Sequence, residues 1–421
     1  MAFARAFAST TFRSLRTRNY KLYFFGQSAS LIGTWMQTIA LGWLVLDLSD
    51  NSGFAVGFVI ALQFLPTLLL GAWGGVVADR FDKRAVLVIT QAVMAMTAAV
   101  LGVLVVTDVV TLWMVYALVL VFGAAQALDN PARLSFVSEM VGLDDVSNAV
   151  GLNSTMFQMA RIVGPAIAGV LIVAIDTGPC FLINAVSYVA VIVALLAMDT
   201  RELHRGEPVA KEKGQVREGL RYVWRTAELR SLLLLTFVVG TLTINFPVVL
   251  PLIAKITFDG NAGTYSVMTI AMGIPALIGG LVIAHRARAD ERLLFGAGLF
   301  FGAAITVAAL APSLAIFVVL IASVGVGQIA FMTTCNTMTQ LRSEPRMRGR
   351  VMAVYAVAVL GSTPIGGPLI GWISQEFGPR YGLALGGVAA IVGTLLFGRM
   401  MLRARHATGA ADRDHQSELA A

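Results

Sequence analysis

One arginine lies where a charged side chain is rare. Arg161 sits near the middle of a long apolar run at 147–175, and it is the only charged residue near the middle of any such run in the chain. Ser154 and Gln158 precede it at intervals that place all three along one side of a helix. Because an ionisable group among apolar residues is costly, this pattern predicts a binding role for Arg161. The alternative is that Arg161 only hydrogen-bonds carbonyls that Pro165 or a nearby helix end leaves without donors.

A second polar pattern runs through the apolar segment at 22–48. Gln27, Ser30, Thr34 and Gln37 recur at helical spacing and give an otherwise apolar helix one polar face. A polar stripe is unfavourable against lipid, so we expect it to face the protein interior. Comparable groups occur in later apolar runs: Asn245, Gln328, Thr333, Asn336 and Tyr355. For each of these residues, contact with a ligand and ordinary hydrogen bonding between helices are both open.

The elements that hold these residues must be apolar helices. Of 421 residues, 57% are hydrophobic and 13% charged, whereas soluble domains are roughly 45–50% apolar. Since about 20 residues cross a bilayer as a helix, we predict an all-α membrane protein with twelve transmembrane helices. The expected spans are 22–48, 54–78, 85–107, 111–128, 147–175, 179–198, 229–254, 263–284, 291–310, 314–335, 349–374 and 381–402.

The basic residues are distributed unevenly between the two sides of these spans. If the N-terminus is cytoplasmic, nearly all of the 31 lysines and arginines fall in or beside the tails and loops on the cytoplasmic side. The exceptions are Arg161, Lys255 and Arg380. This asymmetry is typical of the positive-inside rule and predicts that both termini are cytoplasmic. The net charge of +7 is thereby explained by topology, so no nucleic-acid partner is expected.

Few residues are available for proton exchange or for catalysis. Asp47, near the outer end of the first span, and Asp129, at the inner end of the fourth, are the carboxylates closest to the apolar interior. Each is a candidate for proton coupling or a simple boundary residue. Cys180 and Cys335 are the only cysteines, and both lie in predicted spans, which argues against a disulfide framework. No phosphate-binding loop, hydrolase triad or metal-ligand cluster is evident, so we expect no enzyme activity, no cofactor and no metal.

A charged insert at 199–228 divides the chain into two halves with six spans each. Gly74-Gly75 and Gly164-Pro165 in the first half recur as Gly279-Gly280 and Gly367-Pro368 at nearly the same offset, which suggests a duplication. Two halves oriented alike would enclose a cavity near the bilayer midplane. The expected organisation is a cytoplasmic tail at 1–21, a six-helix bundle at 22–198, a linker at 199–228, a second bundle at 229–402 and a tail at 403–421.

Charge is concentrated between the second and third spans, directly after paired glycines. The cluster comprises Gly75, Asp79, Arg80, Lys83 and Arg84. It resembles the loop signature of the major facilitator superfamily, with Asp82 where that family most often has glycine. The resemblance implies a latch that stabilises one end state, with Asp79 contacting the other half. The second copy is degenerate in the family, and Ala284 takes the place of Asp79 here. The simpler alternative is an anchor that holds the loop inside by charge.

The fifth span carries a stripe of small residues. Ala160, Gly164 and Ala168 recur every four residues, which predicts close packing against another helix. Pro165 removes a donor, so a bend is expected there. Together with Gly151 and Gly169, these residues resemble the exporter-associated motif of the same superfamily, with alanine at two positions where glycine is usual.

The resemblance extends over roughly residues 16–400. The stretches 130–133 and 148–154 are similar to the branch that includes enterobactin and macrolide exporters. One departure is that 111–128 contains no basic residue, whereas many drug/proton antiporters of the superfamily carry an arginine inside the fourth span.

The resemblance implies a secondary active exporter of small amphipathic molecules, of the drug or siderophore class, that works by alternating access with proton antiport. It would be a monomer in the bacterial inner membrane, in contact with substrate, protons and lipid. The expected cavity residues are Gln27, Thr34, Gln37, Gln158, Arg161, Asn245, Gln328, Asn336 and Tyr355, and the expected gating residues include Gly164, Pro165 and Gly169 beside the loop cluster. An importer or facilitator of the same fold and a non-transporting receptor or scaffold are the alternatives.

Overall fold

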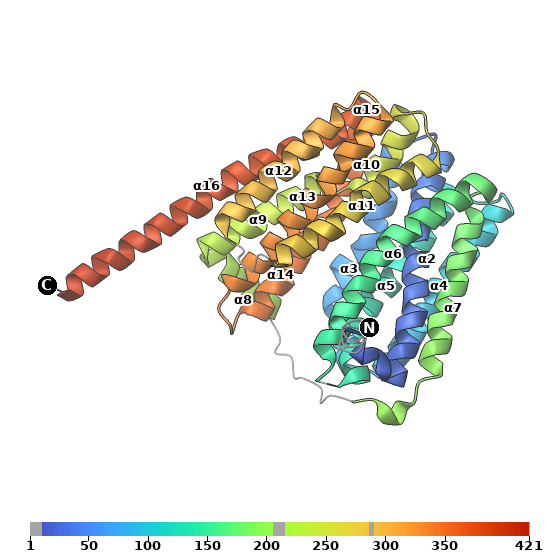
Figure 1. Ribbon diagram of the computed structural model, residues 1–421, viewed down its shortest axis with the longest axis horizontal. Coiled ribbons are helices and arrows are strands. Elements are labelled where there is room, and N and C mark those ends of the chain that lie inside the picture. The colour runs from blue at the N-terminus through green and yellow to red at the C-terminus, as the bar shows by residue number, and fades with distance from the viewer. Residues whose placement is uncertain (1–10, 143, 205–214, 286–289, 421) are drawn as a thin grey trace, which may run out of the picture. The chain divides into compact units, whose positions relative to one another are not determined.

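The computed structural model describes residues 11–142, 144–204, 215–285 and 290–420 (Figure 1). Within these residues, twelve helical segments are long and apolar enough to cross a membrane, which confirms the predicted fold class. The first six are α2 (Arg18–Leu48), α3 (Gly53–Arg80), α4 (Lys83–Val106), α5 (Leu112–Val141), α6 (Val146–Ile175) and α7 (Gly178–Leu196).

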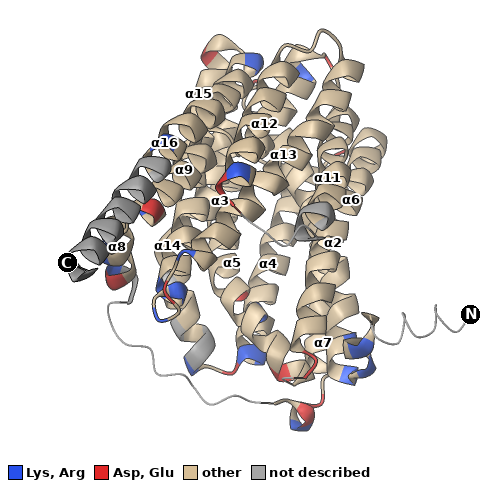
Figure 2. Ribbon diagram, turned by 60° about the vertical axis from the view of Figure 1, so that its left-hand side comes forward, with Lys and Arg blue, Asp and Glu red and all other residues tan. Residues whose placement is uncertain are grey.

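The later helices follow a linker that contains η2 (Thr200–Glu202) and α8 (Gln215–Arg225). They are α9 (Ala227–Leu242), α10 (Phe246–Leu252) with η3 (Ile253–Thr257), α11 (Ala262–His285), α12 (Glu291–Ala309), α13 (Leu314–Leu341), α14 (Arg348–Leu360), α15 (Thr363–Phe377) and α16 (Pro379–Ala420). A short helix, η1 (Arg13–Arg16), precedes α2. Figure 2 shows that the charged residues gather mainly near helix ends.

Short polar side chains fix where several helices begin. The Ser52 hydroxyl accepts a hydrogen bond from the Ala55 amide at the start of α3, and Asp290 accepts one from the Leu293 amide at 2.8 Å at the start of α12. Asp82 caps α4 in the same way, with its carboxylate 3.0 Å from the Ala85 nitrogen. An N-cap satisfies a donor that the first helical turn leaves open. The aspartate that departs from the family loop pattern therefore has a local structural role in this chain.

The chain forms two compact units. The first contains Met1–Ala210 and Leu250–Ile270, and the second contains Lys211–Val249 and Ala271–Ala421. The segment Leu250–Ile270, which falls within the second bundle expected at 229–402, belongs to the first unit. This segment includes η3 and the beginning of α11.

The same helix pairs recur in both units, as a duplication would produce. In the first unit α4 packs against α5 and α7, and α2 packs against α7. In the second unit α12 packs against α13 and α16, and α9 packs against α16. Along the chain, α12, α13 and α16 correspond in order to α4, α5 and α7. These matching pairs agree with the repeat inferred from the glycine landmarks.

Prolines mark two helix breaks. The seventh span is interrupted between α9 and α10, where Pro247 stands in the first turn of α10, and the eleventh between α14 and α15, where Pro364 opens α15. Proline is tolerated in a first turn, where its missing N–H has no helical acceptor, but it cannot continue a preceding helix. The two interruptions thus follow from the positions of these prolines. In contrast, α6 runs without interruption through Pro165.

The fourth span is longer than the sequence pattern suggested. The prediction ended it at 128, but α5 continues to Val141 and includes Pro131. Twelve further helical residues follow Asp129. Arg133, beyond the stretch 111–128 that contains no basic residue, is part of the same helix. Charged residues lower the hydropathy of this stretch, but here they neutralise each other inside the helix packing.

Candidate functional site

Arg161 lies on a half-buried aromatic surface of the first unit. Its guanidinium carbon is 5.8 Å from the centroid of the Trp35 ring of α2, and the Phe157 ring meets Trp35 edge-on at 5.7 Å. Gly164 brings the two helices close, because a Cβ there would come within 2.6 Å of the Trp35 Cβ and 2.7 Å of the Ile32 carbonyl oxygen. The small-residue stripe thus packs as expected and positions the tryptophan beside the arginine. We call Trp35, Phe157 and Arg161 the aromatic–arginine cluster.

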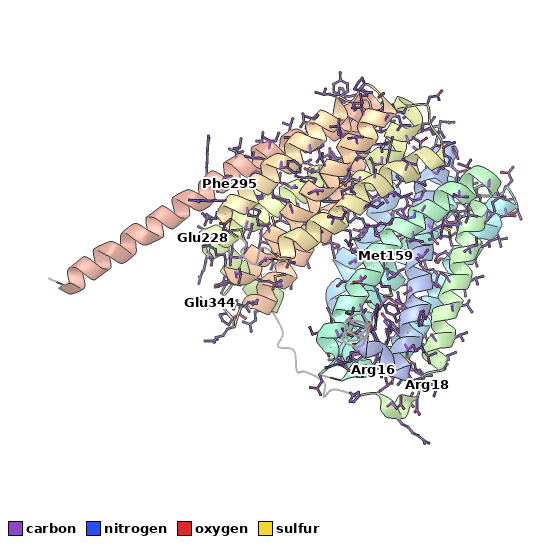
Figure 3. All side chains as sticks on the ribbon, viewed as in Figure 1. Arg16, Arg18, Met159, Glu228, Phe295 and Glu344 are labelled. Atoms are coloured by element: carbon purple, nitrogen blue, oxygen red, sulfur yellow. The ribbon has the colours of Figure 1, made fainter. Side chains whose placement is uncertain are left out.

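The helix α6 has one packed face and one open face. Met156 and Ala160 are buried, whereas Phe157 is 42% exposed and Met159 49%. Figure 3 labels Met159 on α6. Gln158 and Arg161 are intermediate in exposure and, being three residues apart, lie together on the side of α6 away from Met156 and Ala160. A surface of this kind can contact an aromatic or aliphatic ligand through Phe157 and hydrogen-bond its polar groups through Gln158 and Arg161.

The polar face of α2 points into helix contacts. Gln27 and Gln37 are only 3% and 7% exposed. Asn184 of α7 donates a hydrogen bond to the Gln37 Oε1 at 2.6 Å, and the Thr34 and Tyr188 hydroxyls are 2.9 Å apart. The expected burial of this face is therefore observed. For Thr34 and Gln37, contacts between α2 and α7 already account for the polar groups.

Asp129 is the centre of a buried polar cluster between α4 and α5. Its carboxylate accepts hydrogen bonds from the Thr90 hydroxyl and the Gln91 side-chain amide, both at 2.9 Å. Arg133, one helical turn later, places its Nε 3.3 Å from the other carboxylate oxygen. The side chains of Asp129 and Arg133 are 5% and 15% exposed. Removing either partner of such a buried pair would leave the other charge without compensation.

The loop after α3 is anchored to neighbouring helices of the same unit. Lys83 forms an ion pair with Glu139 of α5. Arg84 donates to the Leu195 and Leu196 carbonyl oxygens at 2.6 and 2.9 Å, at the end of α7. Cations near the C-terminal carbonyls of a helix are stabilising. These two basic residues thus hold the loop in place by direct contacts.

The remaining residues of the loop signature take no defined part in these contacts. Arg80 is exposed and Gly75 is half-buried, while the side chain of Asp79 lies outside the described side chains. The neighbouring Gly74 packs tightly, because a Cβ there would come within 2.5 Å of the Ala127 carbonyl oxygen. The latch role assigned to this signature stays a prediction.

The other end of the first unit carries a further ion pair. Asp47, close to the end of α2, pairs with Lys255 of η3, and the Lys255 ammonium lies 5.2 Å from the Trp43 ring centroid. A Cβ at Gly169 would approach the Ser266 Cβ to 2.7 Å, so α6 also touches the beginning of α11 closely. Asp47 and Lys255 are respectively 46% and 24% exposed in their side chains, which makes this pair more accessible than the one at Asp129.

The second unit contains a cavity of about 410 Å³ between α13 and α14. Its lining includes Met332, Thr333, Asn336, Tyr355 and Val359. The structure thus brings together three of the polar residues that the sequence pattern singled out. The Tyr355 hydroxyl donates to the Met332 carbonyl oxygen at 3.4 Å.

Two other predicted residues of this unit are placed apart from that cavity's lining. Asn245 is 3% exposed and donates to the Thr241 carbonyl oxygen at 2.7 Å, which helps to close the break between α9 and α10. Its Oδ1 is buried without a hydrogen-bond partner among the described atoms. Gln328 is intermediate in exposure and engaged in a contact.

Several residues of these clusters were missed by the sequence patterns. Thr90, Gln91 and Glu139 gave no signal, since each is an isolated polar residue in or beside an apolar run. Arg133 was noted only as part of a local resemblance. Its spacing of four from Asp129 on one helix could have predicted the ion pair, because such residues lie on the same helix face.

A comparison with known protein families gives a match over almost the whole chain. A family model described as transmembrane secretion effector matches residues 9–420. The chain belongs to this family of major facilitator transporters. Proteins of this family are multi-pass membrane proteins, as the twelve spans also indicate.

Curated relatives of this secretion-effector chain cover most of its length. It is 23% identical over 381 residues to a staphyloferrin A transporter of Staphylococcus aureus, covering 89% of this chain and 94% of that protein. It is 28% identical to the multidrug efflux pump Tap of Mycobacterium tuberculosis, covering 85% and 87%. It is 26% identical to macrolide efflux protein A of Streptococcus pyogenes, covering 89% and 94%.

Solved transporter structures share the fold at lower sequence identity. The nucleoside transporter NupG superposes with a TM-score of 0.71 at 12% identity, covering 92% of this chain and 98% of that chain. A bacterial homologue of the iron transporter ferroportin gives a TM-score of 0.70 at 14% identity, covering 91% and 98%. These similarities show the major facilitator fold.

Proposed function

We propose that this chain exports small amphipathic molecules, of the drug or siderophore class, by alternating access in exchange for protons. The observation that carries the proposal is the aromatic–arginine cluster, a cation among exposed aromatic and apolar side chains within a membrane-spanning helix. Relatives named as a multidrug efflux pump, a macrolide efflux protein and a siderophore transporter support export over import.

The substrate is proposed to contact polar groups offered separately by each unit. In the first unit these are Arg161 and Gln158, on the open face of α6. In the second unit they are Asn336 and Tyr355, at the cavity beside α13 and α14. Apolar contacts would come from Phe157, an exposed aromatic ring that meets Trp35 of the aromatic–arginine cluster.

Proton coupling is proposed to act through Asp129. The carboxylate is held by Arg133, Thr90 and Gln91, and the adjacent guanidinium balances its negative charge inside the helix packing. We infer that Asp129 binds a proton only when Arg133 moves away during the transport cycle. Asp47 is the second candidate, because its pairing with Lys255 would break in a similar manner.

The remaining parts of the proposal concern location and gating. The chain is proposed to be a monomer in the bacterial inner membrane with both termini cytoplasmic, as the distribution of basic residues favours. The loop signature from Gly75 to Arg84 would stabilise one end state, and the packed stripe with Gly164, Pro165 and Gly169 would guide the movement of α6. No enzymatic step is part of this proposal.

The test is transport by purified protein in proteoliposomes with an imposed pH gradient. Candidate drugs and siderophores are supplied, and Arg161→Ala is compared with Met159→Ala, a neighbouring exposed change on the same helix. We expect Arg161→Ala to abolish flux while the protein remains folded, and Met159→Ala to retain most of it. Unchanged flux in Arg161→Ala would contradict the central role of this residue.

Two further results would favour the alternatives. Accumulation of substrate in cells that overproduce the protein, in place of depletion, would indicate an importer or facilitator. Absence of flux of every candidate under every gradient would favour a receptor or scaffold.

A further inference from the structure

The linker helix α8 presents an exposed face of unusual composition. Arg217, Arg221 and Arg225 are exposed and recur every four residues, so they form one basic stripe. Leu220 and Trp224 are 49% and 58% exposed, and at 3.6 residues per turn they form an apolar stripe directly beside it. We call these five residues the α8 face.

The opposite side of α8 is fixed to the second unit. Val223 is 2% exposed, and α8 packs against α14 (Figure 1). A Cβ at Gly219 would come within 2.8 Å of the Arg350 carbonyl oxygen, so the helix backbones approach closely there. Arg350 also pairs with Glu218, the only acidic residue of α8. The Glu218 side chain is 53% exposed, but its charge is paired with Arg350, so the exposed side of α8 has a net basic charge.

Two attachments place α8 at the level where membrane spans begin. Only Thr226 separates Arg225 from α9, the start of the seventh span. The Thr226 amide donates to the Tyr222 carbonyl oxygen at 3.0 Å, and Arg230 of α9 donates to the Trp224 carbonyl oxygen at 3.2 Å, so this corner is well held. Near the middle of α8, Gly219 lies beside Arg350 in the first turn of α14, where the eleventh span begins.

A helix tied to the ends of two spans lies at the level of the membrane surface. In that position an exposed tryptophan and leucine meet the boundary of the acyl region, and the adjacent arginines meet the headgroups. Solvent alone would leave the apolar stripe unfavourably exposed, whereas a zwitterionic surface would leave the basic stripe without counter-charge. Charge complementarity therefore favours a negatively charged lipid surface.

We propose that the α8 face is a binding site for anionic phospholipid headgroups, which anchor the linker of the second unit to the membrane surface. The ligand class is a phosphodiester lipid with net negative charge, such as phosphatidylglycerol. The arginines bind its phosphate, and Leu220 and Trp224 insert among the upper acyl carbons. This site is separate from the aromatic–arginine cluster and from the cavity between α13 and α14.

The test uses the full-length protein in phosphatidylcholine vesicles that contain increasing fractions of bromine-labelled phosphatidylglycerol. Bromine quenches nearby tryptophan, and subtracting the signal of Trp224→Phe isolates the contribution of Trp224. We expect this contribution to be quenched at low fractions of the anionic lipid. With bromine on phosphatidylcholine alone, quenching at the same fraction should be weaker. Each arginine replaced by glutamine should weaken apparent lipid association by about fivefold, so the triple variant should lose roughly a hundredfold.

Two matched variants control for total charge and for side-chain shape. Replacing Arg217, Arg221 and Arg225 by lysine keeps the charge and should preserve the preference for anionic lipid. Replacing Arg201, Arg292 and Arg346 by glutamine removes three exposed arginines outside α8 and should leave Trp224 quenching unchanged. If this second variant loses as much Trp224 quenching as the glutamine variant of the three α8 arginines, the proposal is overturned. Equal quenching by both labelled lipids, or no quenching of Trp224 by either, would also overturn it.

Discussion

The ion pair at Asp129 allows a prediction whose size follows from the structure. The two charged groups are 3.3 Å apart and their side chains are 5% and 15% exposed. At an effective dielectric constant of about 20, charges at this distance attract by about 5 kcal/mol. Asp129→Asn keeps an oxygen that can accept from Thr90 and Gln91 but leaves the Arg133 charge buried without its carboxylate. Breaking one side of a buried pair costs about 3–5 kcal/mol, and we expect a loss of that order in the free energy of unfolding.

The assay is unfolding in mixed micelles with increasing denaturing detergent, followed by far-UV circular dichroism. Asp129→Asn, Arg133→Gln and the double variant form a cycle with the original protein. The double variant removes both charges, so it should regain at least about 2 kcal/mol relative to the sum of the single losses, as expected for residues in direct contact. In proteoliposomes, Asp129→Asn should also lose most flux that depends on a pH gradient.

Two results would refute this reasoning. If Asp129→Asn changes the free energy of unfolding by less than about 1 kcal/mol, the pair is not the buried contact that the geometry indicates. If the losses of the single variants simply add in the double variant, the two groups do not interact energetically. Full pH-driven flux in a folded Asp129→Asn protein would show that Asp129 does not carry the coupled proton, whatever its role in stability.

Further predictions concern local packing and capping. Gly74→Val should destabilise the protein by about 1–3 kcal/mol, because a Cβ there would lie 2.5 Å from the Ala127 carbonyl oxygen. Gly71→Val is the matched control, since a Cβ at Gly71 meets nothing within 4 Å. Equal melting temperatures of the two variants would contradict the packing argument. Asp82→Ala should lower the free energy of unfolding by about 1 kcal/mol, because it removes the N-cap of α4. Asp82→Asn keeps a capping oxygen and should retain the stability in the same melting experiment. An equal loss of stability in both variants would show that the charge of Asp82 matters and that its capping does not.

The spans and their breaks were largely predictable from the sequence. Each span is a long apolar run, and an apolar run in a membrane has few alternatives to a helix, because lipid offers no partners for backbone groups. The breaks before Pro247 and Pro364 follow from the geometry of proline itself. Arg161 stood out for the same reason, since a lone charge in an apolar run is visible without knowledge of its neighbours.

The end of α5 shows where this local argument fails. Asp129 and Arg133 lower the hydropathy of the segment, so the predicted span stopped at 128, whereas the helix continues to Val141. Charges that neutralise each other inside a helix bundle are tolerated there, but hydropathy counts each one separately. The spacing of the two residues carried the missing information.

Sequence alone determined that this chain is a twelve-span membrane protein with an internal repeat, a single mid-span arginine and proline-broken helices, because these properties depend on segment length and composition. Tertiary structure decided which partners each polar residue has: Trp35 beside Arg161, Asn184 bonded to Gln37, and Glu139 paired with Lys83. These contacts join helices separated by long stretches of sequence. They depend on how each helix is rotated and how closely it packs, which the periodicity of a single segment does not specify.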